Sequence, residues 1–180
     1  MKIRSFALLF AGTAAILTQL PAADTDASAA AFIKLANGII AQTVAGKIDV
    51  PAVRKDVAAM EQLASAFAVQ YKAKYPAGTK LLDFMLAKRD GLTGMTLEEI
   101  DAQFESDAIN KAHGKELGLD LTAEENEHFG NAVDLFVHPA TAAICAGLWE
   151  KDHQGEHLKR MQSELQEVIE HCHHVVDKLK

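Results

Sequence analysis

The feature that most constrains the fold is an apolar repeat near the C-terminus. Seven residues recur there at alternating spacings of three and four: Leu158, Met161, Leu165, Val168, Cys172, Val175 and Leu179. This spacing places them along one side of an α-helix and is typical of a helix that packs against a partner in a bundle or coiled coil. A sheet requires alternation with a period of two, which no segment shows over a useful length. The repeat therefore predicts an all-α protein.

The rest of the chain also has helical spacing and helix-start signals. Asp49 followed by Pro51 is typical of a helix start. Thr96 with Glu99, and Thr122 with Glu125, match the capping-box pattern. Helices are expected over residues 27–46, 49–75, 79–88, 97–112, 122–150 and 153–180. The prediction is an antiparallel helical bundle of about five or six helices, forming a single domain over residues 24–180.

Pro139 falls inside the helix expected over residues 122–150. Proline lacks a backbone N–H and its ring collides with the preceding turn. We therefore expect either a kink at this position or a new helix that begins after His138.

The first 23 residues have the pattern of a secretory signal peptide. Lys2 and Arg4 precede an uncharged, mostly apolar run over residues 5–20, and small residues follow it. The run is shorter than the roughly 20 residues that a membrane-spanning helix needs. Cleavage is expected after Ala23, with cleavage after Ala29 as the alternative. The mature protein is then expected in the periplasm or outside the cell, with no later segment that spans a membrane.

Composition argues against several functions. The formal charge is −7, and removal of Lys2 and Arg4 with the signal peptide leaves 16 basic against 25 acidic residues, a charge of −9. An acidic chain without a basic patch is not expected to bind nucleic acid. The phosphate-binding loop, the C-x-x-C-H haem motif and the H-E-x-x-H zinc motif are missing from the sequence. No serine or cysteine has a context that indicates an activated nucleophile, so an enzyme is the weaker interpretation.

Histidines supply the chemistry that remains, since seven of the eight lie between His128 and His174. If residues 122–150 and 153–180 form an antiparallel hairpin, facing residues have numbers that sum to about 305. Asp134 then faces His171, and His138 faces Glu167. Each helix contributes a carboxylate and an imidazole four residues apart, which lie on one face. This set suits a zinc, iron or manganese ion, and bundle cores are where such sites are built.

A second candidate set lies nearer the turn of the same hairpin. It consists of Cys145, His153, His157 and Met161. Thiolate and thioether ligands favour Cu(I), so this set predicts a copper site. Cys145 and Cys172 are offset by about 12 residues in the hairpin, or about 18 Å of helix, which is too far for a disulfide. Free, buried thiols are therefore favoured, although an exported protein would permit the bond.

Two functions stay open on the sequence. The first is an exported bundle that binds a transition metal (zinc, iron or copper) through C-terminal histidines and carboxylates. The alternative is a metal-free interaction module that binds a partner protein, such as an immunity-type inhibitor or a chaperone-like binder.

Overall fold

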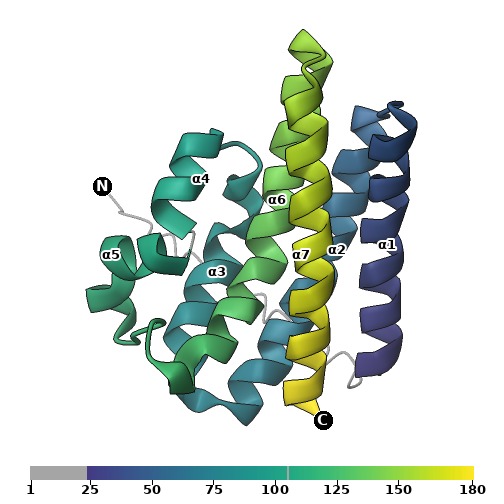
Figure 1. The fold of residues 1–180 in the computed structure, drawn as a ribbon. Coiled ribbons are helices and arrows are strands. Elements are labelled where there is room, and N and C mark those ends of the chain that lie inside the picture. Colours follow the sequence, from purple (N-terminus) through teal and green to yellow (C-terminus); the bar gives the residue numbers. More distant parts are fainter. Residues whose placement is uncertain (1–23, 105) are drawn as a thin grey trace, which may run out of the picture.

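The computed structural model describes residues 24–104 and 106–180, and the regular structure within these ranges is helical (Figure 1). The helices are α1 (Thr25–Ala45), α2 (Val50–Lys74), α3 (Thr79–Leu92), α4 (Leu97–Phe104), α5 (Ser106–Leu117), α6 (Glu127–Asp152) and α7 (Gly155–Leu179). Short 3₁₀ turns at Pro76–Gly78 and Glu124–Asn126 precede α3 and α6. The predicted all-α class is confirmed for the described part of the chain.

The four longest helices pack side by side, and three shorter ones lie along one flank (Figure 1). The most extensive contact is between α6 and α7, and α7 also packs against α1 while α2 packs against α6. α3 lies against α6 and α2, and α4 packs on α5 and reaches α6. α6 is therefore in contact with α2, α3, α4 and α7 and forms the centre of the arrangement.

The C-terminal repeat forms the face of α7 that enters the core. Five of its seven side chains have no exposed surface: Met161, Leu165, Val168, Cys172 and Val175. Leu158 and Leu179, at the two ends, are partly buried against the same core. The predicted register of α7 is therefore correct.

Pro139 does not interrupt α6, which runs unbroken from Glu127 to Asp152. The prediction of a new helix after His138 is therefore wrong. A proline inside a helix removes one hydrogen bond and costs about 3 kcal/mol or more. The cost is offset by packing, since Pro139 and the side chains around it are buried in the core.

Of the two predicted capping boxes, one forms. Thr96 and Glu99 make the expected reciprocal hydrogen bonds. Thr122 instead bonds to the carboxylate of Asp120, through both its backbone N–H and its hydroxyl, so no capping box forms there. The single helix expected over residues 97–112 is replaced by α4 and α5, and α5 continues to Leu117.

The predicted signal peptide, residues 1–23, lies outside the described residues. Asp24 caps α1, because its side chain accepts hydrogen bonds from two backbone N–H groups of the first turn. Cleavage after Ala23 would leave this cap in place. Cleavage after Ala29 would remove it together with the first turn, which includes the buried Ser28.

Two helical segments are long and apolar enough to cross a membrane by length and composition alone, namely Thr25–Ala45 and Glu124–Asp152. Neither was expected from the sequence. In this fold 33% of the most apolar window of Thr25–Ala45 is buried, and for Glu124–Asp152 the share is 67%, as in the core helix of a globular protein.

Replacing Leu165 with alanine should lower the free energy of unfolding by about 2–5 kcal/mol, because a fully buried leucine leaves a cavity when it is truncated. Lys159→Ala is the control, since Lys159 is exposed on the same helix and should change stability by less than about 0.5 kcal/mol. Urea denaturation of both variants measures the difference. Equal losses would contradict the assigned register of α7.

Candidate metal centre

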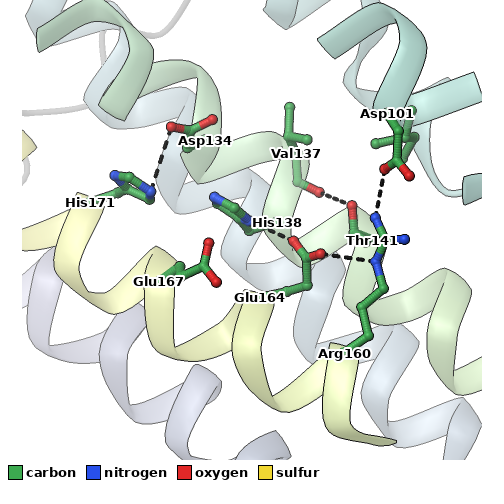
Figure 2. A pocket seen from close by; sticks show the side chains of 10 residues that line it. Asp101, Asp134, Val137, His138, Thr141, Arg160, Glu164, Glu167 and His171 are labelled. Carbon is green, nitrogen blue, oxygen red and sulfur yellow. Dashed lines mark hydrogen bonds and ion pairs between the residues drawn. The ribbon is translucent and has the colours of Figure 1, made fainter. Parts of the chain in front are cut away.

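Asp134, His138 and His171 come together where α6 and α7 face each other (Figure 2). Asp134 and His138 are one helical turn apart on α6, and His171 comes from α7. One ligand atom from each residue lies within 4.8 Å of the other two. Among the described residues, this is the one group of three or more His, Cys, Asp or Glu side chains that is close enough to hold a metal ion.

The three side chains line a cleft of about 350 Å³ between α6, α7 and α4. The cleft is also lined by Ile100, Asp101, Val137, Thr141, Arg160, Glu164 and Glu167. Its side chains include four carboxylates besides the two imidazoles, and a single arginine. This balance of charge favours a bound cation.

His171 is oriented by Asn131, which lies about one turn after the start of α6. The Nδ1 atom of His171 is 2.7 Å from Oδ1 of Asn131, and its Nε2 atom is 3.6 Å from Oδ2 of Asp134. A neutral ring that donates from Nδ1 to Asn131 leaves the Nε2 lone pair on the Asp134 side. Burial, with help from His138 and His174, lowers the pKa of His171 to about 4. His171 is therefore neutral at pH 7, as a metal ligand must be.

His138 has the opposite electrostatic environment. Its Nδ1 atom is 2.6 Å from Oε2 of Glu164. Burial lowers the pKa of His138, but the hydrogen bond to Glu164 and the nearby charges of Asp134, Glu164 and Glu167 outweigh it, so the pKa is raised. The bond to Glu164 fixes the ring and leaves Nε2 as the nitrogen for a metal, the arrangement in which a carboxylate supports a ligating histidine.

Glu164 is itself held in place by Arg160. The Nε atom of Arg160 donates to Oε1 of Glu164 at 3.1 Å, and its Nη2 atom donates to Asp101 of α4 at 2.6 Å (Figure 2). The chain of contacts from α4 through α7 to α6 therefore determines the orientation of the His138 ring.

The two imidazole rings lie face to face across the cleft. Their centroids are 5.1 Å apart and their planes are inclined by only 8°. Pro139, the residue after His138, has not turned this ring away from α7. The side chains of His138 and His171 thus come from different helices and still lie within reach of one ion.

Glu167 lines the same cleft but does not bond to His138, the residue it was expected to face. It is exposed and accepts a hydrogen bond from Ser163 at 2.8 Å. Glu164, one turn earlier, takes the ring instead, because Arg160 fixes its carboxylate. Glu167 still lies close enough to raise the pKa of His138.

The structure does not assemble the second candidate set into one accessible site. Cys145 and Met161 have no exposed surface and belong to the core. Burial raises the pKa of Cys145 to about 12, which keeps the thiol protonated. His153 is exposed and ends α6 in a left-handed conformation, and His157 pairs with Asp152 at 3.1 Å. Both cysteines, Cys145 and Cys172, are free and buried.

Asn131, Glu164 and Arg160 were not singled out from the sequence. The pairs Asn131–His171 and His138–Glu164 each have residue numbers that sum to 302, one helical turn away from the sum of 305 used for the hairpin. Pairing each histidine with residues one turn away in the same hairpin register would have identified Asn131 and Glu164.

Comparison with known proteins identifies no relative, since no protein-family model, curated protein or solved structure matches the chain.

Stability of the metal-free protein should fall between pH 6.5 and about 4 because of His171. Its folded pKa of about 4 lies below the usual value of 6.5, so the unfolded chain binds a proton in this range that the folded chain does not. His171→Gln cannot titrate and should show a smaller loss over the same range. Chemical denaturation at pH 7 and pH 4.5 measures this, with His173→Gln, at an exposed position of α7, as the control. Equal losses for wild type and His171→Gln would contradict a neutral His171.

Proposed function

We propose that this protein binds one transition-metal ion, Zn²⁺ in the first instance, between α6 and α7 through Asp134, His138 and His171. The observation that carries the proposal is the convergence of three ligand atoms within 4.8 Å, from two helices. It is supported by the partner that each imidazole has at its other nitrogen, Glu164 for His138 and Asn131 for His171. Ligating histidines are usually held by such partners, which fix the tautomer and the ring orientation.

The spacing of the ligand atoms is compatible with zinc after a small closure. Zinc bonds of about 2.0–2.1 Å in a tetrahedron place ligand atoms about 3.3 Å apart. Separations of up to 4.8 Å therefore shorten by roughly 1.5 Å, which rotations of partly exposed side chains provide. Glu167 or a water molecule would take the fourth position, since Glu167 lines the cleft.

The ligand types favour zinc or iron over copper(I). Two imidazoles and a carboxylate suit Zn²⁺, and the same combination with open positions suits Fe(II). Neither Cys145 nor Met161 is among the residues that line the cleft, so no sulfur ligand is offered to a soft ion there. Zn²⁺ binds a neutral imidazole and therefore competes with protonation of His138, whose pKa is raised, so we expect the affinity to fall as the pH is lowered.

The proposed role is metal handling outside the cytoplasm rather than catalysis. Export rests on the signal-peptide pattern of residues 1–23, and the cap that Asp24 provides to α1 is consistent with a mature chain that begins there. A carrier needs a site that a cation can reach, and the cleft is formed by half-buried rather than fully buried ligands, with 15%, 18% and 24% of the side chains of His138, Asp134 and His171 exposed.

Isothermal titration calorimetry with Zn²⁺ at pH 7.5 should show one binding site with a Kd below about 10 µM. His138→Ala and His171→Ala should each lose at least about 100-fold in affinity, and the double variant should lose little more, because both histidines serve one ion. Asn131→Ala should lose about 10- to 100-fold, since it orients a ligand without being one.

His153→Ala and His173→Ala are the matched controls, because both histidines are exposed and lie on the same hairpin. They should bind Zn²⁺ like the wild type. A loss for His153→Ala and not for His138→Ala would move the site to the turn of the hairpin, where His153 lies. Absence of saturable Zn²⁺ or Fe²⁺ binding would leave the partner-binding module as the surviving interpretation.

A further inference from the structure

A second polar feature lies on α2, far along the chain from the metal centre. Glu61 is only 8% exposed and belongs to a helix face that is otherwise apolar, with Met60, Ala64 and Phe67 also buried. A buried carboxylate without a partner is costly, and an apolar residue would serve the core better. The residue type at this position therefore calls for an explanation outside packing.

One oxygen of this carboxylate has no hydrogen-bond partner. Oε1 of Glu61 is inaccessible to solvent and makes no hydrogen bond to any described residue. Burial, followed by the charge of Asp90, raises the pKa of Glu61 to about 7, and the charge of Arg89 opposes the shift only in part. Nearly all buried polar atoms in folded proteins are satisfied by protein, water or a ligand, so the carboxylate of Glu61 is left unsatisfied. A donor in the adjacent cavity can reach Oε1 only when the Glu61 side chain rotates towards it.

Glu61 lines a cavity of about 330 Å³ between α2, the end of α3 and α6. Its walls combine apolar side chains, Val57 and Ala143 among them, with the glycines Gly91 and Gly94. An added Cβ at Gly91 would meet nothing within 4 Å, so the missing side chain leaves this wall open. The cavity is large enough for a molecule of several non-hydrogen atoms, and its size, walls and buried carboxylate are those of a small-ligand pocket.

The charges around the cavity leave Glu61 without a cation of its own. Arg89 is committed to Asp90 at 3.0 Å and to Ser65 at 2.6 Å. Arg54 stands at the rim, but its Nη2 atom lies against Gly147 of α6. Arg54 is not among the groups that shift the pKa of Glu61. Glu61 therefore lacks a cationic partner, and a positively charged ligand group could pair with its carboxylate.

A metal ion is a poor candidate for that donor. Among the described residues, the group of side chains close enough to hold a metal is the one at Asp134, His138 and His171, and Glu61 does not belong to such a group. The apolar walls at Val57 and Ala143 instead suit an alkyl chain.

We propose that this cavity binds a small aliphatic molecule through a protonated primary amine, with the ammonium group donating to Glu61 and the alkyl chain packed against Val57 and Ala143. Asp90, at the same cavity, adds negative potential at the ammonium group. The inference does not depend on the proposed zinc site, which is lined by different residues.

The probe is n-butylamine, titrated at pH 8 into the full chain labelled with ¹⁵N, and n-butanol is its uncharged match. At this pH Glu61 is ionised while an alkylamine is still protonated. We expect saturable shifts of the amide signals of Ala58, Gly91 and Ala143, with a Kd of roughly 1–10 mM, and binding of n-butanol at least about tenfold weaker.

Two variants test the position of the site. Glu61→Gln keeps the shape but removes the charge, and Ala58→Phe places a ring at an exposed position of the cavity wall. Both should weaken n-butylamine binding at least tenfold. Glu170→Gln, at an exposed position of α7, should bind it like the wild type. Unchanged binding by Glu61→Gln or by Ala58→Phe, equal binding of n-butanol, or absence of saturable shifts would overturn the proposal.

Discussion

The packing of α7 against α6 is the interaction on which the rest of the structure depends. The buried face of α7, centred on Leu165, aligns the two helices antiparallel and sets their register. That register fixes which polar residues meet along the edge of the same interface. A slip of one turn would separate His171 from Asp134 and His138 from Glu164, because each pair bridges the two helices. The core and the cleft are therefore two sides of one helix contact.

The cleft shifts the pKa values of its two imidazoles in opposite directions. His138 is surrounded by carboxylates, which raise its pKa, and His171 is buried beside another histidine, which lowers its pKa. Because His171 is neutral near pH 7, the two rings stacked at 5.1 Å do not both carry a positive charge there. A divalent cation at Nε2 of both rings would supply positive charge to the four carboxylates that line the cleft.

The fold was largely predictable from the sequence because the spacing of apolar residues identifies helices and their buried faces. The spacing along α7 identified its buried face, and the pairing of Asp134 with His171 followed from the hairpin register. The new helix that was one of two alternatives at Pro139 does not form, since burial in the core keeps α6 continuous where local propensity favours a break. Thr122 was misjudged for a related reason, because the nearby Asp120 competes for its hydrogen bonds.

The partners that orient the candidate ligands were less predictable. Glu164 and Glu167 are one turn apart on α7, and either could reach His138 by register alone. The choice of Glu164 depends on Arg160 and, through it, on Asp101 of α4, a contact between residues 59 positions apart in the chain. Glu61 was hidden within an apolar stripe, where only the three-dimensional packing reveals a carboxylate oxygen without a donor.

The most direct test of the central claim, one ion held by histidines from two helices, is zinc K-edge X-ray absorption on the protein loaded with one equivalent of Zn²⁺. The account predicts a first shell of nitrogen and oxygen atoms at about 2.0–2.1 Å, with the outer-shell scattering of two imidazole rings. A shell made of oxygen atoms without imidazole scattering, or one that contains sulfur at about 2.3 Å, would contradict it.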